Sequence, residues 1–284
     1  MAFFRAACIQ LRSGKTVSEN IAVAETLIRS AAGKGASYLQ TPEMSNVLVR
    51  SREELLDRIA DEDGDPFLAR MRALAAELEV FIHIGSIAVL SDNGKVANRA
   101  FVIEPAGAIL ARYDKIHMFD VDLPNGESWR ESATYEPGTQ TVIADLFGIK
   151  VGMAVCYDIR FPAIFRTQAR AGAEVLTAPA AFTRQTGRAH WHVLQRARAI
   201  ENGAFVISAA QGGTHEDGRE TFGHSLVVDP WGEILAELDH DEPGYVLAEI
   251  DTAMAVKARQ RIPAIANERD FVCATADGLK EMTA

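Results

Sequence analysis

The sequence has little of what stabilises small secreted proteins or crosses membranes. Its 284 residues include only three cysteines, the widely spaced Cys8, Cys156 and Cys273, so a disulfide framework is not expected. No apolar run reaches the roughly 18 residues that a membrane span needs. The first residues also lack the basic-then-apolar layout of a signal peptide. These absences predict a protein of the reducing cytoplasm that has no membrane partner.

Basic residues and metal-ligand motifs are scarce as well. Lys and Arg total 29 against 39 for Asp and Glu, which gives a net charge of −10. Such an acidic chain repels phosphate backbones, so we expect no nucleic-acid partner. The chain has no His-Glu-x-x-His and no paired Cys-x-x-Cys, and His190 and His192 point to different faces of a predicted helix. We therefore predict neither a metal ion nor another cofactor.

The composition is that of an ordinary globular protein, with 48% hydrophobic and 24% charged residues. Because no repeat, low-complexity tract or linker interrupts it, we predict a single domain over residues 1–284. Predicted strands and helices alternate, but hairpin turns break the alternation, so the fold class is α/β with mixed sheets. Two sheets packed face to face with helices outside are the simplest layered arrangement for about a dozen strands.

Hydrophobic periodicity and turn residues set the predicted elements. Residues 118–140 read as one long loop, which in a compact domain is usually functional. Hairpin turns are predicted at Ser91–Gly94 and at Pro230–Gly232. The predicted helices cover 18–32, 52–59, 66–78, 162–172 and 190–202. The predicted strands cover 4–11, 38–40, 80–90, 98–104, 109–115, 150–155, 174–179 and 204–210, and a final strand and helix follow.

Cys156 is the first candidate for chemistry. It stands where the apolar strand 150–155 ends and a new element opens before Pro162. A strand-to-helix turn exposes a side chain at the carboxyl edge of a sheet and aims backbone N–H groups at a ligand. An isolated cysteine is also commonly a small buried hydrophobe. Position alone leaves both interpretations open, whereas Cys8 and Cys273 favour the structural one.

A nucleophilic cysteine needs neighbouring charges. An unperturbed thiol is only a few per cent thiolate at neutral pH. Glu43, after Thr41-Pro42, and Lys115, in Tyr113-Asp114-Lys115, stand at the ends of two other predicted strands. Either residue alone is more often a solvated surface charge. The combination of the three is what indicates a catalytic site.

The order and local context of Glu43, Lys115 and Cys156 resemble the nitrilase superfamily of carbon–nitrogen hydrolases. Essentially the whole chain is similar, and its closest resemblance is to the branch that contains deaminated glutathione amidase and omega-amidase. Arg188 departs from that branch, in which Pro commonly follows Thr-Gly, and it would add a charge beside the pocket. The segments that carry the resemblance are 41–43, 113–117, 152–162, 182–191, 197–199, 209–211 and 223–232.

The resemblance implies a four-layer αββα sandwich whose monomers pair into a homodimer or a higher homo-oligomer. It implies that Glu43 is the general base, and that Lys115 stabilises the thiolate and the oxyanion with help from the N–H of Tyr157. Glu131 matches a second glutamate that holds the lysine.

The resemblance also implies a substrate pocket. Arg160 matches a position that binds the substrate carboxylate, to which a planar guanidinium is suited. Phe182 and Thr186 would shape the pocket around it. A different role for Arg160 stays open, in which it ties the start of the helix to Asp158.

The expected function is cofactor-independent hydrolysis of a small carboxylate-bearing amide through a thioester, foremost of deaminated glutathione. Omega-amidase activity on 2-oxoglutaramate and hydrolysis of N-carbamoyl amino acids keep the same three residue types and remain alternatives. An interaction protein that has retained the fold is the non-enzymatic alternative. The presence of all three residue types weighs against it.

Overall fold

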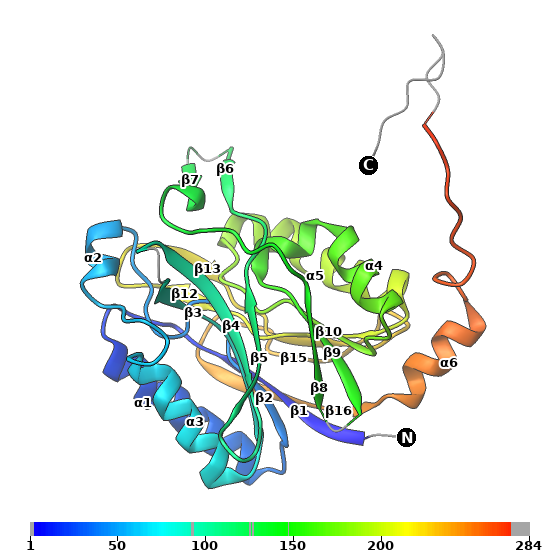
Figure 1. The fold of residues 1–284 in the computed structure, drawn as a ribbon, viewed down its shortest axis with the longest axis horizontal. Helices are drawn as coiled ribbons and strands as arrows, with labels where there is room; N and C mark the ends of the chain where they lie inside the picture. Colours follow the sequence, from blue (N-terminus) through cyan, green and yellow to red (C-terminus); the bar gives the residue numbers. More distant parts are fainter. Residues whose placement is uncertain (1–2, 92–93, 125, 127, 147, 274–284) are drawn as a thin grey trace.

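Two six-stranded mixed sheets pack face to face in a computed structural model that describes residues 3–91, 94–124, 126, 128–146 and 148–273 (Figure 1). The first sheet has the order β16 (Gly244–Asp251), β1 (Phe3–Gln10), β2 (Tyr38–Gln40), β3 (Phe81–Leu90), β4 (Val96–Ile103) and β5 (Ile109–Asp114). The second has the order β15 (Ile234–Glu237), β14 (Leu226–Val228), β11 (Phe205–Ser208), β10 (Val175–Thr177), β9 (Ile149–Met153) and β8 (Val142–Leu146).

Helices cover the outer faces of both sheets (Figure 1). On the first sheet lie α1 (Val17–Gly33) and α3 (Pro66–Leu78), and on the second lie α4 (Pro162–Arg170) and α5 (Arg184–Asn202). Two shorter helices are α2 (Arg52–Leu56) and α6 (Ala253–Arg261). The predicted αββα sandwich with mixed sheets is confirmed.

The alternation of side chains along β1 shows how the layers are held together. Ala6 and Cys8 belong to the apolar core shared with the second sheet. Ala7 and Ile9 point the other way, into the core that the first sheet forms with α1 and α3. Because successive side chains of a strand face opposite sides, a strand buried on both faces is apolar throughout.

Several element boundaries differ from the predictions. Helix α5 begins at Arg184 rather than at residue 190, because the Thr183 hydroxyl accepts from the N–H of Thr186 and caps the helix there. Helix α2 ends at Leu56, earlier than predicted. Strand β8 and the hairpin of β12 (Gly212–Thr214) and β13 (Glu220–Phe222) were not predicted.

The predicted loop 118–140 also has structure of its own. It contains the hairpin of β6 (Asp120–Asp122) and β7 (Ser128–Arg130), followed by a 3₁₀ turn, Glu131–Ala133. Of the turn predicted at Ser91–Gly94, residues 92–93 lie outside the described residues, but β3 and β4 do pair antiparallel as that turn requires.

Within the described part of the chain, no helix is both long and apolar enough to cross a membrane. After α6 the chain runs to Cys273 without helix or strand and leads away from the sandwich (Figure 1).

Candidate active site

Cys156 opens a 3₁₀ turn, Cys156–Arg160, between β9 and α4. Its φ of 49° lies in the left-handed region, which costs an L-residue about 1–3 kcal/mol and marks functional turns. The Cys156 N–H donates to the carbonyl of Pro179 at 2.9 Å. The backbone therefore fixes the thiol at the carboxyl edge of the second sheet.

Asp158 holds this turn from inside. Its side chain is fully buried and accepts from the N–H of Val155 at 2.8 Å and from the Tyr113 hydroxyl at 2.6 Å. His117 adds contacts from its N–H at 3.1 Å and from its ring Nδ1 at 2.7 Å. Asp158 thus ties the nucleophile's turn to the end of β5 and is not available to Arg160.

The structure brings Glu43, Lys115 and Glu131 together beside the thiol. Lys115 follows β5 and donates from Nζ to Glu43 Oε1 at 2.9 Å and to both oxygens of Glu131 at 2.9 and 2.8 Å. Glu43 follows β2, in the first sheet, so the strand ends of the two sheets meet at the site. The Cys156 thiol and Glu43 line the same pocket, and each shifts the pKa of the other. Lys115 is 2% exposed, which explains why it needs two carboxylate partners.

The charges in this cluster set its resting protonation state. Burial alone would raise the pKa of Glu43, but Lys115, the thiol and the amide of Ala181 hold it below its usual value. Burial would lower the pKa of Lys115, but Glu131 and Glu43 raise it well above the usual value. Burial and the charge of Glu43 raise the pKa of the Cys156 thiol. The resting site therefore holds a neutral thiol beside an ionised glutamate and an ionised lysine.

Two partners of the glutamates were missed in the sequence. Asn98, on β4, donates from Nδ2 to Glu43 at 2.9 Å and to Glu131 at 3.2 Å. The N–H of Ala181 donates to the other oxygen of Glu43 at 2.9 Å. An asparagine inside an apolar strand is unusual and was a usable signal. A backbone amide leaves no such signal.

A pocket of about 310 Å³ opens above these residues, within the size range of small-molecule sites. The hairpin β6–β7 supplies part of its rim, so the long segment 118–140 does line the site. Arg188 is exposed on α5 and does not line the pocket, so the expected charge beside the pocket is wrong. The predicted binding residues that line it are Tyr157, Arg160, Phe182 and Thr186.

Arg160 faces aromatic rings rather than a carboxylate. Its guanidinium carbon lies 5.2 Å from the ring centroid of Phe182 and 5.8 Å from that of Tyr157. Its Nη1 lies 3.2 Å from Nδ1 of His190. Burial lowers the pKa of Arg160. No ion pair between Arg160 and a carboxylate is present among the described residues. The alternative in which it binds Asp158 is not observed.

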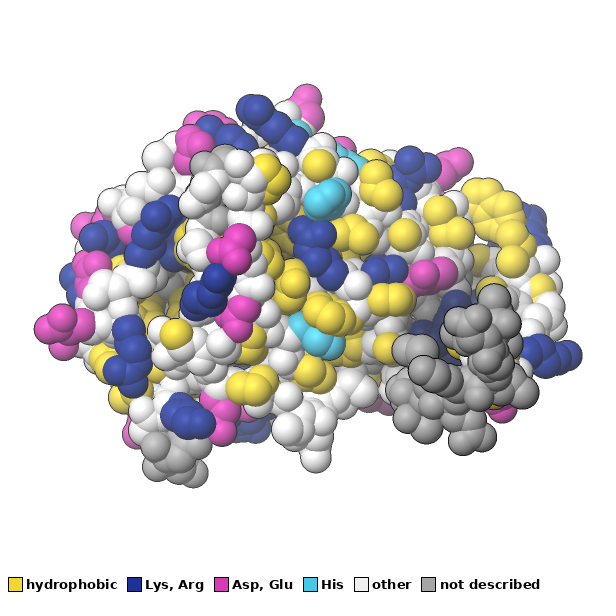
Figure 2. Space-filling model, turned by 90° about the horizontal axis from the view of Figure 1, so that it is seen from above, with side chains coloured by type: hydrophobic (Ala, Val, Ile, Leu, Met, Phe, Trp, Pro, Cys, Tyr) yellow, Lys and Arg dark blue, Asp and Glu magenta, His cyan; other side chains and the backbone are white. Residues whose placement is uncertain are grey.

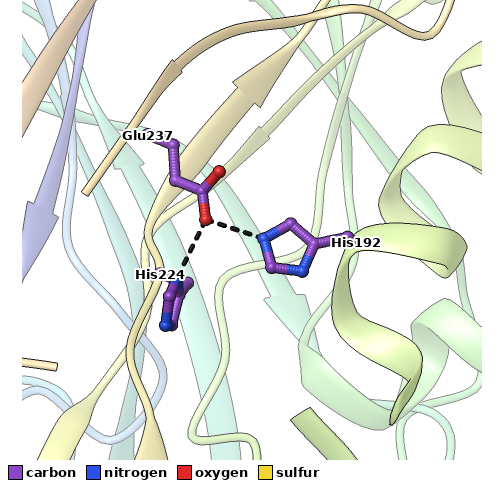
Figure 3. A group of neighbouring side chains, drawn as sticks. All are labelled: His192, His224 and Glu237. Carbon is purple, nitrogen blue, oxygen red and sulfur yellow. Dashed lines mark hydrogen bonds and ion pairs between the residues drawn. The ribbon is translucent and has the colours of Figure 1, made fainter. Parts of the chain in front are cut away.

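Outside this pocket, one group of described residues could hold a metal ion. His192 Nε2 and His224 Nδ1 both contact Glu237 Oε1, at 2.7 and 2.8 Å (Figure 3). The spacing of His190 and His192 does not predict this group, because its members come from α5, from the segment before β14 and from β15. The two contacts to Glu237 account for the arrangement without an ion.

An αββα sandwich with glutamate, lysine and cysteine gathered at its strand ends has the architecture of the nitrilase-like hydrolases. The family model for carbon-nitrogen hydrolase matches residues 5–260. The chain belongs to the carbon–nitrogen hydrolase family, and it is an amidase of that family.

Named relatives cover nearly the whole chain. Deaminated glutathione amidase of Synechocystis sp. is 40% identical over 275 residues, which cover 95% of this chain and 99% of the relative. Omega-amidase NIT2 of Homo sapiens is 35% identical over 271 residues, which cover 95% of this chain and 96% of the relative.

Solved structures share the fold. Nit3 of Saccharomyces cerevisiae, of the nitrilase superfamily, has a TM-score of 0.83 at 27% identity and covers 92% of this chain and 94% of its own. A glutamate-to-glutamine mutant of an amidase from Nesterenkonia sp. AN1 has a TM-score of 0.76 at 25% identity. The match covers 92% of this chain and 98% of the mutant, which carries acrylamide added at its active site cysteine.

Proposed function

We propose that this amidase hydrolyses a small carboxylate-bearing amide, foremost deaminated glutathione, through a thioester on Cys156. The observation that carries the proposal is Arg160. It lies four residues after the nucleophile in the same pocket, without a carboxylate partner among the described residues. A partly buried guanidinium of this kind is suited to a ligand carboxylate.

Acylation begins from a neutral thiol. Sγ of Cys156 attacks the amide carbonyl carbon while Glu43 takes the thiol proton, because this ionised carboxylate lines the same pocket as the thiol and each shifts the pKa of the other. The carbonyl oxygen becomes an oxyanion, for which Lys115 Nζ and the N–H of Tyr157 are the donors. Both oxygens of Glu131 accept from Lys115 Nζ, so we assign Glu131 the role of positioning that lysine.

Collapse of the tetrahedral intermediate breaks the C–N bond. Glu43 returns its proton to the departing nitrogen, which leaves as ammonia or an amine, and a thioester remains on Cys156. Water then attacks the thioester carbonyl while Glu43 takes its proton. The released thiolate recovers that proton, and the acid product leaves.

Three alternatives use the same residues. Omega-amidase activity on 2-oxoglutaramate needs only one carboxylate site, and hydrolysis of an N-carbamoyl amino acid needs a carboxylate on the amine side. An interaction protein would not need a buried Lys115 between two carboxylates, since such a group requires specific partners to be stable.

A substrate screen tests the proposal. The protein is incubated with deaminated glutathione, 2-oxoglutaramate and N-carbamoyl amino acids, and products are followed by mass spectrometry. We expect 2-oxoglutarate from deaminated glutathione, and none with the matched Cys156→Ala variant. Hydrolysis of N-carbamoyl amino acids alone would overturn the choice of substrate.

We also propose that the protein is a homodimer or a larger homo-oligomer of the reducing cytoplasm. Large apolar side chains are exposed along α5 and the turn before β15, with Val193 68%, Ile200 52% and Trp231 50% exposed. A Cβ at Gly232 would meet the Ile200 side chain, so Ile200 lies beside the turn that carries Trp231. Exposed apolar residues grouped in this way are typical of an interface. The three cysteines are free, which suits a reducing compartment.

A further inference from the structure

The pocket carries cations on two of its walls. Arg160 stands on the wall formed by Tyr157 and Phe182. On another wall Arg50 and Arg219 share one aromatic ring, their guanidinium carbons lying 5.1 and 4.8 Å from the ring centroid of Trp129. This second wall is built from the segment before α2, from β7 and from the β12–β13 turn.

On the second wall, positively charged side chains outnumber the carboxylates that pair with them. Arg219 has one acidic neighbour, Asp217 at 3.2 Å, and its Nη2 donates to the carbonyl of Val49 at 3.3 Å. Its Nε is buried without a hydrogen-bond partner. Arg50 is exposed and forms no ion pair with the described residues. Two arginines therefore face a single carboxylate.

A third arginine of the same pocket serves as a comparison. Arg130 also lines it, but both oxygens of Asp122 contact its Nη2, at 2.9 and 3.0 Å. Basic and acidic side chains are interspersed over the face that Figure 2 shows. A group of basic side chains can bind an anion where its positive charge exceeds the negative charge of the neighbouring carboxylates. Arg130 is balanced by Asp122 alone, whereas Arg50 and Arg219 together have only Asp217 as an ion-pair partner among the described residues.

We propose that Arg50 and Arg219 form a second carboxylate subsite, which receives the carboxylate of the leaving amine. This inference rests on the proposed function, in which Arg160 holds the carboxylate of the acyl part. The preferred substrate then carries one carboxylate on each side of the scissile amide. An anion bound there offsets the positive charge that Asp217 leaves unbalanced.

The two leading substrates differ in just this respect. Deaminated glutathione has a 2-oxo acid carboxylate on the acyl side and a glycine carboxylate on the amine side. 2-Oxoglutaramate has only the first, because its leaving group is ammonia. Both yield the same acyl thioester on Cys156, so a residue that binds the leaving group affects acylation by one substrate and leaves deacylation unchanged.

The experiment measures kcat/KM of four variants, Arg50→Met, Arg219→Met, Arg160→Met and Arg130→Met, on both substrates. Arg219→Met should lower kcat/KM for deaminated glutathione on the order of tenfold to a hundredfold. It should leave the value for 2-oxoglutaramate nearly unchanged, and Arg50→Met should act in the same direction. Arg160→Met should lower both values, and Arg130→Met neither.

Equal losses on both substrates with a lower melting temperature would make Arg219 a structural residue and overturn the subsite. So would an unchanged kcat/KM for deaminated glutathione in both Arg50→Met and Arg219→Met.

A binding measurement keeps the test independent of turnover. Cys156→Ala is titrated by calorimetry with glutaryl-alanylglycine, whose amine-side carboxylate lies as far from the amide as that of deaminated glutathione, and with glutaramate, which has no carboxylate on the amine side. The subsite predicts tighter binding of glutaryl-alanylglycine, and loss of that preference when Arg219→Met is added. Equal binding of the two ligands would contradict the subsite, whether or not the natural substrates are hydrolysed. Absence of hydrolysis of both natural substrates would instead contradict the proposed function.

Discussion

At the scale of single residues, the site works by holding charges out of water in fixed contact. Lys115 bridges Glu43 and Glu131, and Asn98 donates to both carboxylates. The two glutamates nevertheless differ. Glu43 and the Cys156 thiol shift each other's pKa, whereas Glu131 is held by Lys115, by Asn98 and by the N–H of Phe119 at 2.6 Å. We therefore assign proton transfer to Glu43 and positioning to Glu131.

That difference predicts unequal effects of the same substitution. Glu43→Gln keeps the shape but removes the base, so kcat should fall by about 10² to 10⁴. Glu131→Gln should retain more activity, because Lys115 keeps its contact with Glu43. Steady-state kinetics on both variants, with substrate binding measured separately, checks this. Equal and complete loss in both variants, with unperturbed binding, would show that the roles are not divided this way.

The same charges predict the pH dependence of kcat. The pKa of Glu43 is lowered from 4.5, so the base stays ionised until the pH falls below that value. The pKa of the Cys156 thiol is raised above 9.0 and that of Lys115 above 10.5, so neither loses its proton below those values. We expect kcat to be flat between pH 4.5 and 9.0. A limb near pH 6.5, as an imidazole base produces, would contradict this assignment.

At the scale of elements, the turn Cys156–Arg160 places the nucleophile at the end of β9. The sequence predicted this turn, because small apolar residues lead into Cys156 and a proline begins the next helix. It could not predict Asp158 as the anchor, because the partners Tyr113 and His117 are more than 40 residues away. Helix α5 and the β6–β7 hairpin were also misjudged, since capping and hairpin pairing depend on single contacts rather than on periodicity.

Asp158→Asn tests the anchoring of the turn. All four groups that contact Asp158 are N–H or O–H donors or a ring nitrogen, so an amide NH₂ would face at least one of them unpaired. The loss of stability should be about 1–3 kcal/mol, with lower kcat. Tyr113→Phe removes two bonds, the one to Asp158 and the one that the hydroxyl accepts from the N–H of Ile116, and should cost about 1–3 kcal/mol. Thermal unfolding and kcat on both variants decide it, and a wild-type melting temperature for Asp158→Asn would contradict the anchor.

At the scale of the whole molecule, the sandwich brings the two sheets' strand ends to one place. The layers and the mixed sheets could be predicted, because apolar strands and amphipathic helices leave few ways of covering both faces. The sequence does not predict that three residues meet on one wall of the pocket, because three distant segments supply them. These residues are Arg50, Trp129 and Arg219. That the chain is one domain over 1–284 stays a prediction, and the family match covers 5–260.

Self-association of the protein is a further property of the whole molecule. A charge in an apolar interface is costly, so Val193→Glu on α5 should shift sedimentation towards the monomer. The matched control is Val23→Glu, which is 45% exposed on α1 in the opposite helical layer and should change nothing. A wild-type protein that sediments only as a monomer at micromolar concentration would contradict the oligomer.

The proposed mechanism requires that Cys156 carries the acyl group during turnover. The most direct measurement is acid quench of the wild-type protein during turnover of deaminated glutathione, followed by mass spectrometry of the intact chain and of its peptides. We expect a thioester-linked 2-oxoglutaryl group on the peptide that contains Cys156, absent from Cys156→Ala and diminished in Glu43→Gln. Turnover with no adduct at any time point, or an adduct on Cys8 or Cys273 instead, would contradict it.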